Sequence, residues 1–203
     1  SDAYSTINGM RRGAHWANKR GYVDAEGNLL PAGARKNWLV KWLTSCWVDI
    51  DCAEYGLTIG QTLGAVIDAV NAKVIPRPSI LLDSGRGCWC FWLLRGVSPN
   101  DPLLRTEASH QLWQATQGKI LKVFQKIGGD AASTDAARIC RIPGSVNSKV
   151  NRRASYFPWL DLDGFYQTYN LADLARGFGL NPDSVPPQPE LAESAPRKLT
   201  AAA

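Results

Sequence analysis

Hydrophobic and polar positions along the chain predict strands and helices in irregular alternation. Strand-like runs, in which apolar residues alternate or form short continuous stretches, cover residues 4–7, 37–51, 79–82, 88–94, 155–159 and 164–169. Helical spacing predicts one helix or a pair over 102–127, and single helices over 58–72, 135–140 and 171–178, with Thr58 and Asn170 as N-caps. Because no steady strand-helix-strand rhythm appears, we expect an α+β fold with a mixed or antiparallel central sheet flanked by helices.

One strand-like run carries two acids, Asp49 and Asp51, in the otherwise apolar sequence Trp47-Val48-Asp49-Ile50-Asp51. Side chains alternate along a strand, so both carboxylates project from one face, with their Cα atoms about 6.5 to 7 Å apart. Charged residues are seldom buried without a partner. The pair therefore predicts a site for one divalent cation or a close pair of cations, with two solvated aspartates at a strand end as the alternative.

Length and composition indicate one large domain. The 203 residues are 45% hydrophobic, which is enough for a substantial core. We assign residues 1–180 to this domain, with residues 1–40 as a partly irregular subdomain, and the Pro- and Ala-rich residues 181–203 to a linker or disordered tail. The sequence shows no apolar run of about 18 residues and no signal segment, so neither a membrane span nor secretion is predicted.

The cysteines give no indication of a zinc site. Five cysteines without a Cys-x-x-Cys pair predict reduced core residues and no zinc site.

Positive charge is concentrated in two segments of the chain. Residues 11–41 hold seven Lys and Arg against two acids, and residues 138–153 hold five Lys and Arg and no acid. Basic segments beside paired carboxylates favour a polyanionic partner, with a solvated basic face as the alternative. The candidates for DNA contact are Arg35, Lys36, Arg152 and Arg153.

The connection within the predicted hairpin reads Ser84-Gly85-Arg86-Gly87. Glycines let backbone amides approach an anion, and Ser84 and Arg86 can donate hydrogen bonds to a phosphate. A tight turn with a surface arginine explains these residues equally well.

A dense run of one acid, three bases and a Pro-Gly turn follows, comprising Asp135, Arg138, Arg141, Pro143, Gly144, Asn147 and Lys149. On a helical turn Arg138 and Arg141 share a face that can grip phosphates, and Asn147 and Lys149 can reach the same anion. Asp135 is either a third carboxylate for a metal or a helix cap, for which Thr134 is an equally good candidate.

These three segments resemble, in order, the three motifs of the archaeo-eukaryotic primase (AEP) superfamily, in particular the primase and primase-polymerase domains of plasmids, phages and related mobile elements. The resemblance spans roughly residues 4–175. The third segment is the most specific, because it reproduces the family pattern of Asp followed by Arg-x-x-Arg-x-Pro-Gly-Ser/Thr-x-Asn-x-Lys almost completely. An AEP/RRM-like core is the fold that this resemblance implies.

The resemblance also implies a nucleotidyltransferase that synthesises primers on single-stranded DNA from NTPs or dNTPs during replication of a mobile element. Asp49, Asp51 and Asp135 would then be catalytic and hold two Mg²⁺ or Mn²⁺ ions, which suit carboxylate oxygens. Ser84, Arg86, Arg141 and Lys149 would bind the incoming triphosphate, with Arg138 and Asn147 supporting. The tail would be a tether, to a helicase domain fused to the chain or acting in trans, in the cytoplasm of a prokaryotic host.

One position departs from the family pattern. Many members carry a histidine in the second motif that contacts the nucleotide phosphates, and Trp89 stands at the corresponding strand position. Either Arg86 takes over that contact or nucleotide binding is weakened. The alternative function is therefore a catalytically weak or inactive primase-fold module that binds single-stranded DNA or a replication origin. A metal-dependent nuclease is a third option, but it leaves the basic run unexplained.

Overall fold

The described part of the chain combines a mixed sheet with helices on one face. The computed structural model describes residues 2–10, 37, 40–98, 100–131 and 133–185. Its strands are β1 (Tyr4–Thr6), β2 (Gly9–Met10), β3 (Val40–Leu43), β4 (Ser45–Ile50), β5 (Ile80–Asp83), β6 (Cys88–Leu94), β7 (Leu103–Leu104), β8 (Ile139–Arg141), β9 (Val146–Asn147), β10 (Arg152–Arg153), β11 (Ser155–Pro158) and β12 (Thr168–Tyr169). Its α-helices are α1 (Ile59–Asn71), α2 (Glu107–Phe124) and α3 (Leu171–Gly177), with 3-10 turns at Cys52–Tyr55, Gln125–Ile127 and Pro182–Ser184.

The central sheet has the strand order β11-β5-β6-β12, and β4 also pairs with β6. Every pair in it is antiparallel except β12 with β6, which is parallel. Outside this sheet, β1 pairs with β8, β9 pairs with β10, and β3 lies between β2 and β7. The predicted α+β class with a mixed central sheet is confirmed.

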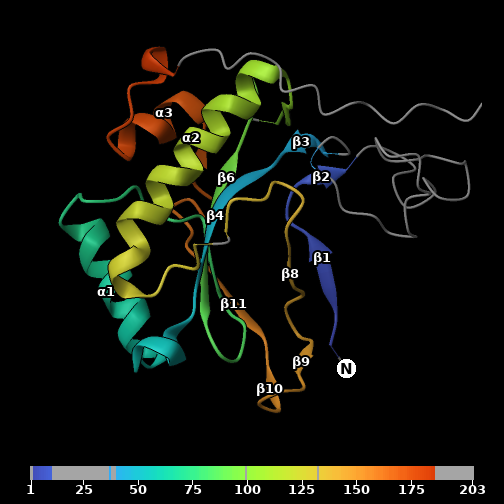
Figure 1. The fold of residues 1–203 in the computed structure, drawn as a ribbon, viewed down its shortest axis with the longest axis vertical. Helices are drawn as coiled ribbons and strands as arrows, with labels where there is room; N and C mark the ends of the chain where they lie inside the picture. The colour runs from blue at the N-terminus through green and yellow to red at the C-terminus, as the bar shows by residue number, and fades with distance from the viewer. Residues whose placement is uncertain (1, 11–36, 38–39, 99, 132, 186–203) are drawn as a thin grey trace, which may run out of the picture.

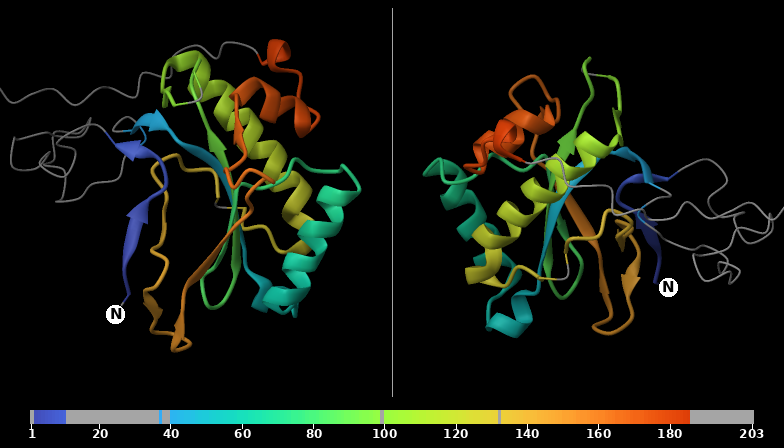
Figure 2. Two further views of the ribbon diagram at one scale, coloured as in Figure 1. Left: turned by 180° about the vertical axis from the view of Figure 1, so that it is seen from behind. Right: turned by 45° about the horizontal axis from the view of Figure 1, so that its top comes forward.

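The helices and the β1–β8 pair lie on opposite faces of the central sheet (Figures 1 and 2). On the helical side, the fully buried Trp92 of β6 packs edge-on against Phe124 of α2 and against Phe178, with ring centroids 5.9 and 5.2 Å apart. Aromatic pairs in this geometry are favourable beyond the area that they bury. The core extends to both faces of the sheet, because Trp47 and Trp89, on the face away from Trp92, are buried as well.

One edge of β4 pairs with β6, and on the other edge side chains of α2 form hydrogen bonds with the β4 backbone. The backbone N–H of Trp47 donates to Oε1 of Gln117 at 3.2 Å, and Nε2 of Gln117 donates back to the carbonyl of Trp47. The indole of Trp113 donates to the carbonyl of Ser45 at 2.9 Å. Buried backbone groups need such partners. Helix α2 therefore holds in place the strand that carries the acid pair.

Three predicted elements differ from the structure. Residues 37–51 do not form one strand, because β3 and β4 are separated at Thr44. The N–H of Thr44 donates to Oδ1 of Asn8 at 2.8 Å and its hydroxyl to the carbonyl of Ile7 at 2.6 Å, while its carbonyl accepts from the N–H of Leu94 in β6 at 2.8 Å. Residues 135–140 do not form a helix: they form turns that lead into β8, and the pairing of β8 with β1 overrides the local helical spacing. Of residues 164–169, only β12 is a strand.

Several predictions fall outside the described residues. Arg35 and Lys36 lie there, as do residues 186–203 of the predicted tail. Within the described ranges, no helix combines the length and apolar character needed to cross a membrane. The division into residues 1–180 and 181–203 stays a prediction.

Candidate active site

The three motifs meet at one pocket of about 200 Å³ on the face of the sheet away from the helices. The residues that line it include both acids of the first motif and residues of the hairpin and of the third motif: Asp49, Asp51, Ser84, Arg86, Gly87, Arg141, Asn147 and Lys149. Of the predicted catalytic and nucleotide-binding residues, only Asp135 and Arg138 are not part of this lining. The fold thus brings together side chains that are up to 100 positions apart in the sequence.

The end of β4 positions the acid pair. Asp49 lies directly opposite Trp89 of β6, which lies opposite Leu82 of β5, so these three side chains share one face of the sheet. Asp51 follows the last residue of β4 and precedes a 3-10 turn. Both carboxylates line the pocket, as the alternation of strand side chains predicted.

A further acid, Asp130, lies beside Asp49. Residues 128–130 run along the end of β4, where the N–H of Asp51 donates to Gly128 at 2.9 Å and the N–H of Asp130 donates to Asp49 at 2.8 Å. Nη2 of Arg138 lies 3.0 Å from Oδ2 of Asp130 and 3.9 Å from Oδ2 of Asp49. The guanidinium of Arg138 therefore forms ion pairs with both carboxylates.

Sequence reasoning missed Asp130, although the two glycines before it were a signal. Gly128 has φ +93°, and a Cβ there would lie 2.8 Å from the Tyr55 ring. A Cβ on Gly129 would lie 3.0 Å from Phe124. Only glycine fits both positions well, so the Gly-Gly pair lets this segment approach β4 closely and present the next side chain to the site.

Asp135, predicted as the third carboxylate, is placed differently. Its Oδ1 accepts a 2.9 Å hydrogen bond from the N–H of Ala137, and its carbonyl accepts one of 3.0 Å from the N–H of Arg138. These bonds hold a turn, and because residues 135–140 are not helical, Asp135 is not the helix cap that the sequence left as the alternative. The geometry brings Asp130, not Asp135, next to Asp49.

The acids around Asp49 change its titration. Burial raises the pKa of Asp49; together with the opposing charge of Arg138 and the added effect of the Asp130 and Asp51 charges, this brings the pKa to about 7. A desolvated carboxylate among other carboxylates keeps its charge best when a cation binds. The positive charge of Arg138 therefore compensates the negative charge of the acids only in part, and a bound cation would stabilise the charged form of Asp49.

The hairpin glycines have separate roles. Gly85 has φ +94°, a conformation that favours glycine, and its N–H donates to Oδ1 of Asp83 at 2.7 Å. A Cβ on Gly87 would overlap the carbonyl oxygen of Ile50, so this residue must stay small for the hairpin to pack beside the acid pair. The Ser84 hydroxyl bonds within the turn, to Gly87, whereas Arg86 is exposed at the pocket.

Arg141 is the most enclosed base of the pocket, with its side chain 8% exposed. Its guanidinium donates to Val146 at 3.2 Å and to the Tyr4 hydroxyl at 2.6 Å, lies 4.7 Å from the centre of the Tyr4 ring, and forms an ion pair with Asp2. The Asp2 carboxylate also accepts bonds from the hydroxyl and N–H of Ser148. Hydrogen bonds from Ser148 and Arg141 lower the pKa of Asp2 to about 2.

The other residues of the third motif have distinct positions. Arg138 and Arg141 do not share a helical face, because Arg138 lies in a turn beside the acids and Arg141 lies in β8. Asn147 donates to the carbonyl of Ser84 at 2.9 Å and so ties the third motif to the hairpin. Lys149 is exposed and lines the pocket. The pocket thus presents bases from two separate segments.

Trp89, at the position of the family histidine, is a packing residue. It is 6% exposed and stacks between Trp47 and Phe91, with ring centroids 5.3 and 5.8 Å away. It lines the pocket beside Asp49 but has only an indole N–H to offer an anion. That Arg86 takes over the phosphate contact of the family histidine, or that nucleotide binding is weakened, stays a prediction.

The described candidates for DNA contact make local bonds. Arg152 forms an ion pair of 2.9 Å with Asp83, and Arg153 donates to the carbonyl of Gly144 at 2.9 Å. Both side chains are otherwise exposed at the β9–β10 hairpin. Their role in DNA binding stays a prediction.

The donor set fits Mg²⁺ or Mn²⁺ in one particular way. Within the described residues, no three His, Cys, Asp or Glu side chains are close enough to form a complete ligand set. Mg²⁺ is usually bound by one or two carboxylates together with substrate phosphates and water. Asp49 and Asp51, with bases nearby for phosphates, provide such a partial site. Four of the cysteines are free thiols buried outside the pocket lining, and Cys140, also a free thiol, is half-buried at the pocket wall.

Known proteins resemble this chain in sequence and in fold. No family model matches it. A replication protein of Clostridium perfringens is 31% identical over 139 residues, which are 68% of this chain and 31% of that protein. The chain thus spans about a third of the length of this curated relative.

The AEP domain of the cyanophage S-2L primase-polymerase (PrimPol) is similar in structure. It superimposes with a TM-score of 0.52 and 16% identity, over 72% of this chain and 65% of that domain. At this identity the likeness concerns the fold, and the order of the three motifs around one pocket agrees with it. The chain therefore has the fold of an archaeo-eukaryotic primase domain.

Proposed function

We propose that this chain is the catalytic domain of a primase or primase-polymerase, a nucleotidyltransferase that extends a primer on single-stranded DNA. The observation that carries the proposal is the pocket itself, which is lined by the acid pair at the end of β4 and by bases from the hairpin and from the third motif. Such a lining suits a metal–triphosphate complex, in which the carboxylates would hold the metal and the bases would bind the phosphates.

The acid pair would hold the divalent cations. Asp49 and Asp51 line the pocket, and Asp130 adjoins Asp49 through the shared Arg138. We take Asp130, in preference to Asp135, as the third acid of the site, where it would support Asp49 through Arg138 without being a metal ligand itself, because Asp135 is bonded within its own turn. When bound, Mg²⁺ or Mn²⁺ ions supply activation of the 3′-hydroxyl and stabilisation of the pyrophosphate that leaves.

The bases would hold the triphosphate. Arg86 and Lys149 are exposed at the pocket, and Arg141 is oriented from within by Tyr4. A guanidinium binds phosphate oxygens in a bidentate way, and a lysine adds a point charge. Arg138 would support this group by keeping Asp49 and Asp130 oriented, and Asn147 by fixing the hairpin.

Substrates and partners follow from the same proposal. Single-stranded DNA would be the template, NTPs or dNTPs the substrates, and a helicase domain, fused or in trans, the partner. The replication protein among the relatives and the PrimPol domain among the structures support a role in replication. A plasmid, a phage or another mobile element in a prokaryotic cytoplasm is the replicon that we propose.

Primer synthesis on circular single-stranded DNA tests the proposal. The chain is incubated with Mg²⁺ or Mn²⁺ and with labelled NTPs or dNTPs, and products are resolved by length. We expect oligonucleotides in at least one nucleotide pool. DNA binding without any product in either pool would favour the non-catalytic binding module instead.

A further inference from the structure

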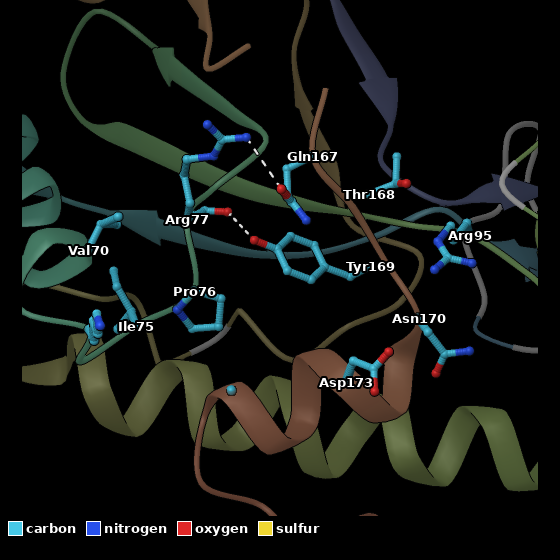
Figure 3. Close-up of a pocket in the computed structure, with 12 residues that line it drawn as sticks. Val70, Ile75, Pro76, Arg77, Arg95, Gln167, Thr168, Tyr169, Asn170 and Asp173 are labelled. Carbon is cyan, nitrogen blue, oxygen red and sulfur yellow. Dashed lines mark hydrogen bonds between the residues drawn. The ribbon is translucent and has the colours of Figure 1, made fainter. Parts of the chain in front are cut away.

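A second pocket lies at the other end of β6 from the catalytic aspartates (Figure 3). It has a volume of about 580 Å³ and lies between the loop after α1, β12 and the start of α3. Trp89 of β6 lines the first pocket and Arg95, just after β6, lines the second, so the two are about 20 Å apart along the strand. A hollow of this size fits a nucleotide-sized group.

Three bases line the second pocket: Lys73, Arg77 and Arg95. None of them forms an ion pair with an acid in the described part of the chain. Asp173, the acid that also lines it, pairs with Arg176 at 2.8 Å, so its charge is already balanced. The pocket therefore presents uncompensated positive charge, which favours an anionic ligand.

The bases differ in how firmly they are held. Arg77 donates to Oε1 of Gln167 at 3.3 Å and to the carbonyl of Leu160 at 3.5 Å, which orients its guanidinium (Figure 3). Among the described residues, the side chains of Lys73 and Arg95 have no hydrogen-bond partner. They can therefore turn toward a ligand without breaking an internal contact.

An aromatic ring is fixed among these bases. The Tyr169 hydroxyl donates to the carbonyl of Arg77 at 2.7 Å, and its backbone carbonyl accepts from the N–H of Arg95 at 2.9 Å. Figure 3 shows the ring in the middle of the pocket, above Pro76. Single-stranded nucleic acids are held by this combination of cations for the backbone and aromatic faces for the bases.

We propose that the second pocket binds single-stranded DNA, with Lys73, Arg77 and Arg95 on phosphates and Tyr169 as the stacking surface for a base. The choice of a DNA strand as the ligand rests on the proposed function, whereas the preference for a phosphate anion rests on the charges alone. The pocket would hold the strand away from the catalytic aspartates.

Fluorescence anisotropy with labelled oligo(dT) of about 20 nucleotides, longer than the usual site sizes, tests this proposal. Binding is measured in chelator and in an Asp49→Asn/Asp51→Asn background, so that failure of the catalytic proposal leaves the readout unchanged. The test variant is Lys73→Gln/Arg95→Gln, which breaks no internal bond. The control is Lys122→Gln/Lys126→Gln, which removes the same charge from the exposed side of α2 and the turn after it.

We expect the test variant to bind at least about fivefold more weakly than the control, with a salt dependence that is shallower by about 0.7 for each lost phosphate contact. Tyr169→Phe, which keeps the ring, should bind like the parent, and Tyr169→Leu should bind at least about fivefold more weakly. Equal affinities for test and control variants would overturn the proposal. Displacement of the oligonucleotide by ATP at equal phosphate concentration would overturn the assignment to a strand and indicate a free nucleotide as the ligand.

Discussion

The backbone N–H of Asp130 donates a 2.8 Å hydrogen bond to the carbonyl oxygen of Asp49. The same two residues share the guanidinium of Arg138. The segment after α2 is thus part of the acidic side of the pocket, although no sequence motif assigned it there.

This relationship predicts which third acid matters. Asp130→Asn should lower the rate of primer synthesis by about 10- to 100-fold, the range for loss of a group that supports metal ligands. Asp135→Asn should stay within about threefold of the parent, because an Asn side chain can also accept the turn hydrogen bond. Initial rates at saturating Mn²⁺ measure both, and the opposite ranking would restore Asp135 as the third carboxylate.

The ion pair between Asp2 and Arg141 predicts that the Asp2 carboxylate competes with the nucleotide phosphates for the Arg141 guanidinium. Its carboxylate takes the guanidinium and the Ser148 donors that a phosphate oxygen would use. Asp2→Asn should therefore lower KM for the nucleotide by up to about fivefold, the range for an exposed ion pair, and leave kcat unchanged. Steady-state kinetics on a primed template measure this. An unchanged or higher KM would mean that the triphosphate does not reach Arg141.

The hydrogen bonds of Gln117 to β4 predict that removal of its side chain lowers the stability of the fold. It is fully buried and satisfies both backbone groups of Trp47. Gln117→Ala leaves these groups without partners and should lower the free energy of unfolding by about 2 to 4 kcal/mol. Gln114→Ala, on the exposed side of the same helix, should change it by less than about 0.5 kcal/mol. Urea titration compares the two, and similar values would show that α2 does not hold β4 in this way.

His110 predicts a loss of stability in acid. Burial and the charge of Arg105 lower the pKa of His110 to about 4, and its Nδ1 lies 3.1 Å from Nη2 of Arg105, where it can only accept. The unfolded chain binds the proton more readily, so this contribution is present above about pH 6.5 and is lost as the pH falls toward 4.

At pH 5 the loss should be about 2 kcal/mol, calculated from the two pKa values. The free energy of unfolding is measured at pH 7.5 and pH 5 for the parent and for His110→Gln. Their difference isolates this side chain from the other titrating groups. Equal pH dependence in both proteins would show that His110 does not carry the effect.

The sequence predicted the parts of the site in which local pattern and chemistry agree. Asp49 and Asp51 follow from strand alternation, and the turn around Gly85 follows from its glycine. The prediction from the sequence was wrong where pairing with a distant strand decides the local conformation. Residues 135–140 have helical spacing, but β8 pairs with β1, so Arg138 and Arg141 point to different surroundings.

Asp130 shows the other limit. Its place beside Asp49 depends on the close packing of Gly128 and Gly129 against residues more than 70 positions earlier and against the end of α2. Periodicity carries no information on such an approach. A Gly-Gly-Asp sequence ahead of a basic motif indicates it only once the neighbouring strand is known.

The acid pair is the centre of the account, and one measurement tests it most directly. Primer synthesis on single-stranded DNA with Mg²⁺ or Mn²⁺ is compared between the parent and Asp49→Asn/Asp51→Asn, with circular dichroism to verify that both are folded. We expect synthesis by the parent, and loss of detectable product with retained oligo(dT) binding in the variant. Undiminished synthesis by the folded variant would contradict the assignment of these aspartates to metal-dependent nucleotidyl transfer.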